Sequence, residues 1–213
     1  AIDTIVPSVA VSIASPSPTD AQNSSTVTFT FTEAPSNFVA GDIIASNGVI
    51  SNLAVTASPM VYTATFTAND GFNGQGTVGV TAGSYTDAAG NAGTGGSASV
   101  PIDTLDPSVA VSMAGSLLSD AQNSSTVTFT FSAAPTSFTI GDITASNGVV
   151  SNLAATANPD VFTATFTANS GFTGQGTAAV TAGSYTDLAG NPGAAGSASI
   201  AIDTQDPSAT VTI

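Results

Sequence analysis

The sequence contains no lysine, arginine, histidine, cysteine or tryptophan, whereas it carries 14 acidic side chains and a formal net charge of −14. Without Lys or Arg there is no cationic surface to hold phosphates, which argues against nucleic-acid binding. Without imidazole, thiol or amine groups, Ser-His, Cys-His and Schiff-base catalysis are impossible within the chain. A buried carboxylate cannot be paired with a basic side chain, so its charge must be solvated, protonated or matched by a cation from solution.

Long hydrophobic runs are also missing. No run of about 18 apolar residues occurs, so we expect no membrane insertion. The low charge content of 7% does not indicate disorder, because 42% of the residues are hydrophobic and phenylalanine occurs 11 times. Disordered chains lack such apolar content, so we expect a folded protein.

The sequence repeats with a period of 100 residues and no gap. The segment AQNSSTVTFTF at 21–31 returns unchanged at 121–131, and 70 of the 100 aligned positions are identical. A unit of this length can bury its own core, unlike solenoid repeats of about 20–50 residues. We therefore predict domains at 1–102 and 103–202, followed by the start of a third copy, a first-strand stub, at 203–213.

Each repeat shows short strand patterns separated by turn residues, with no helix. In Thr26–Phe31 the apolar residues alternate with threonine, which is typical of a half-buried strand. The side chains expected to point inward include Val27, Phe29, Phe31, Tyr62, Phe66, Val78, Val80 and Ala82. The pattern predicts strands at about 8–13, 26–32, 42–46, 49–56, 61–67, 77–82 and 96–102, with the second domain following at plus 100.

The dipeptide Asn47-Gly48 lies between the third and fourth predicted strands. Because Asn-Gly tolerates positive φ at both central turn positions, we expect a type I′ hairpin there. Seven short strands in about 100 residues favour an immunoglobulin-like sandwich. The fold class is therefore predicted to be all-β, with two tandem sandwiches of about seven strands each. Aliphatic and Phe packing must replace the Cys and Trp core of antibody domains.

Three segments resemble a known family. They are DTLDPS at 103–108, YTDAAGNAG at 85–93 and GFNG at 71–74. In their order and spacing they are similar to the bacterial Ig-like tandem repeats of large secreted adhesins, the extender regions of the RTX-adhesin type. The resemblance implies β-sandwiches joined by short linkers, Ca²⁺ at the linkers that stiffens the array, and a location on the bacterial cell surface.

Most carboxylates are expected near strand ends, because successive loops of an antiparallel sandwich alternate between its two ends. With the incoming linker taken as the top, the second domain gathers at that end Asp103, Asp106, Asp142, Asp187 and Asn191. From the lower end of the first domain, Asp20 can reach the same junction. The corresponding top positions of the first domain are Asp3, Asp42 and Asp87, and the third copy begins with Asp203 and Asp206.

Such a carboxylate cluster without basic residues suits Ca²⁺, which takes 6–8 hard oxygen ligands. The alternative is that these residues only form turns, because Asp and Asn side chains stabilise turns without a metal. Val6 stands where the later copies have Asp106 and Asp206, so we expect the top site of the first domain to be weaker or empty. The site at Asp203 and Asp206 should be incomplete, because the rest of its domain is missing.

The sequence favours a structural function over two others. We expect no enzymatic activity, because the carboxylates repeat at domain ends instead of forming one active site. The first hypothesis is a Ca²⁺-stiffened spacer whose partners are the neighbouring repeats of the same chain, in a monomeric fragment. The alternatives are a binding module for glycans or another cell surface, and homophilic contact between arrays. Against a glycan site, few aromatic residues are expected on the outer faces.

Overall fold

The structure is a computed structural model that describes residues 2–14 and 16–213. The chain divides into two units, Ala1–Leu105 and Asp106–Ile213, which are called the first and second repeat below. Each repeat has its own hydrophobic core. Among the described residues, no helix is long and apolar enough to cross a membrane.

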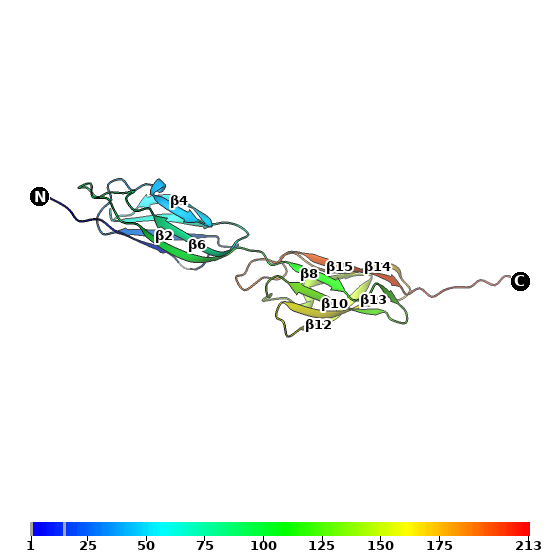
Figure 1. Ribbon diagram of the computed structural model, residues 1–213. Helices are drawn as coiled ribbons and strands as arrows, with labels where there is room; N and C mark the ends of the chain where they lie inside the picture. Colours follow the sequence, from blue (N-terminus) through cyan, green and yellow to red (C-terminus); the bar gives the residue numbers. More distant parts are fainter. Residues whose placement is uncertain (1, 15) are drawn as a thin grey trace. The chain divides into compact units, whose positions relative to one another are not determined.

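The first repeat is a sandwich of a four-stranded and a three-stranded sheet (Figure 1). Its strands are β1 (Val9–Ile13), β2 (Ser24–Phe31), β3 (Ile43–Ser46), β4 (Gly48–Val55), β5 (Val61–Ala68), β6 (Asn73–Val80) and β7 (Gly96–Asp103). The strand order is β1-β2-β5-β4 in one sheet and β3-β6-β7 in the other. A single 3-10 turn, η1 (Ala40–Asp42), precedes β3.

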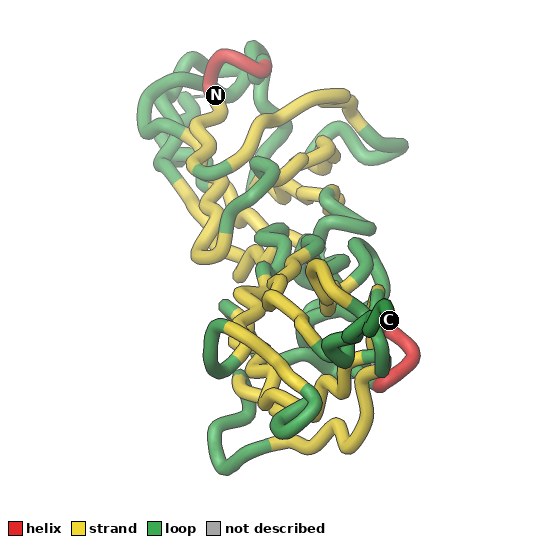
Figure 2. The backbone as a smooth tube through the Cα atoms, turned by 90° about the vertical axis from the view of Figure 1, so that its right-hand side faces the viewer, coloured by secondary structure: helices red, strands yellow, loops and turns green. Residues whose placement is uncertain are grey.

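The second repeat has the same plan with one additional short strand. Its strands are β8 (Val109–Met113), β9 (Leu117–Ser119), β10 (Ser124–Phe131), β11 (Ile143–Ser146), β12 (Gly148–Ala155), β13 (Val161–Ala168), β14 (Thr173–Val180) and β15 (Gly196–Asp203). The sheets have the orders β12-β13-β10-β8 and β11-β14-β15-β9, and the 3-10 turn η2 spans Ile140–Asp142. Apart from the two 3-10 turns, the described chain consists of strands and loops (Figure 2). The predicted all-β tandem of immunoglobulin-like sandwiches is confirmed.

The alternation of apolar residues and threonine creates the core. Val27 and Phe29 are fully buried and Phe31 is 1% exposed, whereas the threonines between them face outward. Of the other residues predicted to point inward, Phe66, Val78 and Val80 are buried and Tyr62 packs against the same core. The prediction for Ala82 was wrong, because β6 ends at Val80 and Ala82 is exposed in the following loop.

Aromatic rings fill the place that a disulfide and a tryptophan occupy in antibody domains. The ring of Phe31 meets those of Phe38, Tyr62 and Tyr85 edge-on, with centroids 4.9, 5.8 and 5.0 Å apart. Edge-to-face contacts of this kind stabilise a core beyond the area that they bury. The second repeat has the same arrangement around Phe131.

The predicted type I′ hairpin at Asn47-Gly48 was wrong. The strands on either side belong to different sheets, because β3 pairs with β6 while β4 pairs with β5. Asn47 has φ 56°, but Gly48 is not among the residues with positive φ. The side chain of Asn47 donates a hydrogen bond to the Gln75 carbonyl (2.8 Å), which holds the end of β3 on β6. A single left-handed residue therefore carries the chain from one sheet to the other.

Two further differences concern strand ends. β6 begins at Asn73 instead of residue 77. Its first inward-facing positions are glycines, so the sequence shows no apolar alternation there. A Cβ at Gly76 would lie 2.5 Å from Ile102 Cδ1 and 2.9 Å from Phe66 Cζ, so neighbouring side chains fill the space that an apolar residue usually marks. β9 was not predicted, because three residues are too few to show a period.

Candidate functional site

Each repeat ends on a buried threonine. The Thr104 side chain, 1% exposed, donates a hydrogen bond to the Asn69 carbonyl (2.7 Å) and accepts one from the Phe72 N–H (3.1 Å). The Thr104 N–H donates to the Phe72 carbonyl (2.8 Å), and its own carbonyl accepts from Gly71 (3.1 Å). Thr204 makes the same contacts in the second repeat. Thr104 is therefore part of the first repeat and not of a flexible linker.

The second repeat begins equally firmly at Pro107. Its carbonyl accepts hydrogen bonds from the Tyr185 hydroxyl (3.1 Å) and the Ala194 N–H (2.8 Å). Tyr185 is fully buried, and burial together with the charge of Asp106 raises the pKa of its hydroxyl, so it remains a neutral donor. In the first repeat, Tyr85 makes the equivalent bond to Pro7 (3.3 Å).

Only Leu105 and Asp106 lie between these two anchored positions. The Leu105 N–H contacts the Asp103 carboxylate at 3.4 Å, which closes an Asx-type turn at the start of the linker. Proline fixes its own φ and restricts the residue before it, which here is Asp106. The covalent connection between the repeats thus has few rotatable bonds outside the two folded units.

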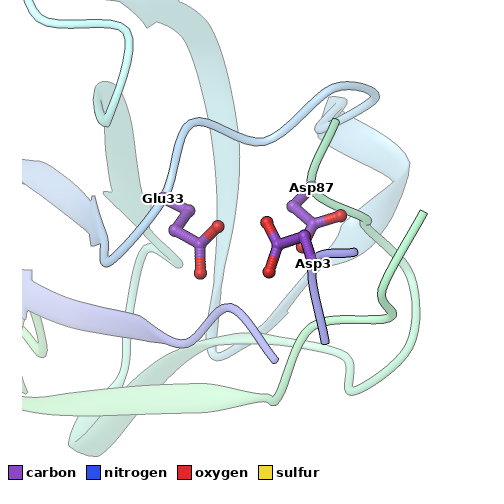
Figure 3. A group of neighbouring side chains, drawn as sticks. All are labelled: Asp3, Glu33 and Asp87. Carbon is purple, nitrogen blue, oxygen red and sulfur yellow. The ribbon is translucent and has the colours of Figure 1, made fainter. Parts of the chain in front are cut away.

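Three carboxylates gather at the N-terminal end of the first repeat. One oxygen each from Asp3, Glu33 and Asp87 lies within 4.8 Å of the others. Asp3 comes from the entering segment, Glu33 from the loop after β2, and Asp87 from the loop between β6 and β7. Figure 3 shows the three side chains pointing toward one another. The chain has no Lys, Arg or His, so no basic side chain is available to form an ion pair with them.

Asp87 organises the loop in which it lies. Its side chain is 3% exposed and accepts hydrogen bonds from the N–H groups of Ala89 and Asn91, both at 2.9 Å. The Asn91 amide adds a third bond at 2.8 Å. These bonds, above all the one from the Asn91 side chain, hold the pKa of Asp87 below its ordinary value despite burial. Asp87 therefore remains charged and has the turn-forming function that the sequence left open as an alternative.

Glu33 was absent from the predicted ligand set. Burial, followed by the charges of Asp3 and Asp87, raises the pKa of its carboxyl group. The prediction that the site of the first repeat is weaker or empty, because Val6 replaces an aspartate, stays a prediction. The sequence does set Glu33 apart. Glu33 and Asp70 are the two acidic residues of the first repeat whose counterparts in the second repeat are not acidic.

The second repeat distributes its carboxylates differently. Ala133 stands where the first repeat has Glu33, and Asp106 stands where it has Val6. Asp187 is 5% exposed and accepts hydrogen bonds from the backbone N–H (2.9 Å) and side-chain amide (3.0 Å) of Asn191, which is fully buried. The charge of Asp106 acts on the buried Tyr185, which places Asp106 near the same end of the repeat.

Asp42 and Asp142 lie at the 3-10 turns. Asp42 accepts a hydrogen bond from the Val39 N–H (2.8 Å), and Asp142 accepts from the Thr139 N–H (2.6 Å) and hydroxyl (3.0 Å). Each carboxylate thereby caps the turn in which it stands. Neither belongs to the group of three carboxylates described above.

The opposite end of each repeat also carries carboxylates. In the second repeat the pKa of Asp120 is raised by burial, by a hydrogen bond with Asp206 and by the charges of Asp206 and Asp203. In the first repeat, Thr19 forms an isolated parallel β-bridge with Asp103, the last residue of β7. Asp20, the next residue after Thr19, therefore lies close to the end of β7. The part of the chain that the structure describes contains no pocket.

Replacing Glu33 by alanine is expected to stabilise the first repeat in cation-free solution at neutral pH and so to raise its melting temperature. A carboxyl group with a raised pKa destabilises the folded state when it is ionised, so its removal relieves repulsion from Asp3 and Asp87. As the pH falls through the raised pKa of Glu33, protonation relieves the same repulsion, and the difference from the wild type should shrink. Calorimetry in EDTA across pH measures this, and a destabilised variant at neutral pH would contradict it.

The fold and the linker define a tandem array of immunoglobulin-like domains, with carboxylates at the domain ends and two residues between the domains. The chain belongs to the bacterial Ig-like domain family, whose pattern matches residues 3–102 and 103–204. No curated protein matches the sequence.

Several solved structures are similar in fold. InvD of Yersinia pseudotuberculosis shares 22% identity over 95% of this chain and 60% of its own, with a TM-score of 0.34. The adhesin InvE of the same organism shares 18% over 92% and 58%, with a TM-score of 0.34. Invasin, described as a bacterial integrin-binding protein, shares 20% over 80% and 36%, with a TM-score of 0.40. The chain thus spans less than two thirds of the length of each.

Proposed function

We propose that these repeats are structural spacers of a bacterial cell-surface adhesin, and that Ca²⁺ at the repeat ends stiffens the array and helps it to project a distal binding region. The observation that carries the proposal is the short linker. Thr104 and Pro107 are hydrogen-bonded into their own repeats, so only Leu105 and Asp106 separate two folded units. A chain built to transmit position over a distance needs such restricted joints, whereas a flexible tether would use Gly- or Ser-rich linkers.

The composition supports a cation as the missing partner of the carboxylates. Asp3, Glu33 and Asp87 offer hard oxygen atoms close to one another, and the chain has no basic side chain to oppose them. Ca²⁺ accepts carboxylates, carbonyls and waters in flexible geometry, and extracellular sites of low affinity are filled at millimolar concentration. Among the predicted ligands, Asp3, Asp87, Asp103, Asp106, Asp187 and Asn191 are the residues that we assign to this function. A location outside the cell and the RTX-adhesin type are parts of the same proposal.

Small-angle scattering and thermal melting in Ca²⁺ and in EDTA test the proposal. We expect Ca²⁺ to raise the melting temperature by mass action, because it binds the folded state, and to narrow the distribution of distances within the molecule. Mg²⁺ at the same concentration should do less, since it demands tight octahedral geometry. Identical curves in Ca²⁺ and EDTA would remove the cation from the proposal and leave a chain of sandwiches with a short linker.

Variants distinguish a cation site from a cluster that only repels. Glu33→Ala should stabilise the first repeat in EDTA but weaken its response to Ca²⁺, so that the sign of its effect reverses between the two solutions. The double variant Asp103→Ala, Asp106→Ala should broaden the scattering distribution in Ca²⁺ without unfolding either repeat. Asp160→Asn is the matched control, because it also removes one negative charge, at a position where the first repeat has Met60.

A further inference from the structure

In each repeat, a short segment near residue 18 or 118 lies beside the last strand, which is β7 in the first repeat and β15 in the second. The two repeats differ in how many residues of this segment pair with that strand. In the second repeat, β9 runs parallel to β15 with three residue pairs, from Leu117↔Ala201 to Asp203↔Ser119. In the first repeat, the equivalent contact is a single parallel bridge between Thr19 and Asp103, with the Asp103 N–H donating to the Pro18 carbonyl (3.0 Å).

Proline explains the shorter pairing. The first repeat has Pro16, Pro18 and Pro101 where the second has Ser116, Leu118 and Ala201, and Ala201 is the ladder partner of Leu117. Proline has no N–H to donate to a strand ladder and is confined to edges and strand ends. The side chains of Pro18 and Leu118 are both buried, so the repeats differ here in their N–H groups, which Leu118 and Ala201 keep.

The other pairings of the terminal strands are the same in both repeats. β1 pairs with β2 over five residues, as β8 does with β10. β6 pairs with β7 over eight residues, as β14 does with β15. The difference at the strand ends is thus confined to the parallel contact made by the segment at 16–19 or 116–119.

This contact lies on the direct path of force through a repeat. The chain enters through β8, continues into β9, and leaves at the far end of β15. When the two ends are pulled apart, the parallel strands β9 and β15 are drawn in opposite directions along their length. A ladder under such shear loads its hydrogen bonds together, so each additional pair raises the barrier to separation.

We propose that the two repeats are graded force-bearing units, in which the β9–β15 ladder makes the second repeat resist pulling more strongly than the first. Under rising tension the first repeat yields first and lengthens the chain while the second remains folded. The difference follows from the strand pairing alone, so it does not depend on the proposed cation or on attachment to a cell surface.

Single-molecule force spectroscopy on the whole chain in EDTA tests the proposal. Both repeats release similar lengths, so a Gly/Ser insertion of about ten residues in the exposed turn between β4 and β5 marks the first repeat by a longer step. We expect the marked repeat to unfold first and, at a given force, about tenfold faster, which corresponds to one or two net hydrogen bonds.

Reciprocal variants connect the effect to the prolines. The double variant Pro18→Leu, Pro101→Ala should slow forced unfolding of the first repeat toward the rate of the second, and Leu118→Pro should speed that of the second. Val150→Ala is the control, because it weakens a half-buried site in β12, away from the terminal strands. It should lower the melting temperature while the order of unfolding stays the same. If the repeats unfold in random order, or if the double variant Pro18→Leu, Pro101→Ala leaves the rate unchanged, the proposal is wrong, whether or not Leu118→Pro folds.

Discussion

Replacing Phe31 by alanine is expected to lower the free energy of unfolding of the first repeat by about 3–5 kcal/mol. The side chain is 1% exposed and contacts the rings of Phe38, Tyr62 and Tyr85 edge-on. Its removal leaves a cavity among rigid rings that cannot close around it. Small domains are stable by about 5–15 kcal/mol, so the loss is a large part of the total.

Urea unfolding of the intact chain measures this effect with an internal reference. The second repeat has its own core, so Phe31→Ala should separate an early transition, from the first repeat, from an unchanged later one. Phe131→Ala should do the reverse. Thr30→Ala, on the exposed face of the same strand, is the matched control and should change little. A single cooperative transition that moves as a whole would show that the repeats are not independent folding units.

Gly93→Ala is expected to destabilise the first repeat by a comparable amount, roughly 3–5 kcal/mol, as overpacking and lost hydrogen bonds combine. A Cβ at Gly93 would lie 2.1 Å from Tyr85 Cζ. The ring cannot move aside cheaply, because it is fully buried and its hydroxyl donates to the carbonyls of Pro7 (3.3 Å) and Thr94 (2.9 Å). Displacing it would release the segment that enters the repeat.

Gly41→Ala provides the matched control, since a Cβ there meets nothing within 4 Å. Calorimetry should show a lower first melting transition for Gly93→Ala and almost none of this shift for Gly41→Ala. The combined variant Gly93→Ala, Tyr85→Phe should recover little stability, because the clash involves the ring and not the hydroxyl. Equal effects of the two glycine variants would contradict the packing explanation.

The strand pattern could be predicted because a half-buried strand has apolar residues at alternate positions, on the side that faces the core. Phe29 and Phe66 are fully buried where the alternation with threonine expected them. The turn at Asn47-Gly48 could not be predicted in the same way, because this dipeptide permits a hairpin without requiring one. Whether β3 continues into the same sheet depends on its partner β6, which lies about 30 residues further along the chain.

The candidate site was only partly visible for a related reason. Asp87 stands out in its loop motif, but Glu33 belongs to no motif and comes near Asp87 only when two distant loops meet. Thr104 looks like an ordinary linker residue in the sequence, and its burial arises from contacts with the loop after β5. Contacts between segments far apart in the chain leave no local pattern.

The sequence by itself determined the duplication, the all-β class and the core face of the strands in which apolar residues alternate with threonine. Those features depend on local alternation and on composition, which do not require knowledge of the neighbouring strands. Only the tertiary structure decided that β3 and β4 part into two sheets, that Glu33 joins Asp3 and Asp87, and that the linker shortens to Leu105 and Asp106. The physical reason is that these features are pairings between distant segments, whose partners are chosen by packing and hydrogen bonding once both sheets have formed.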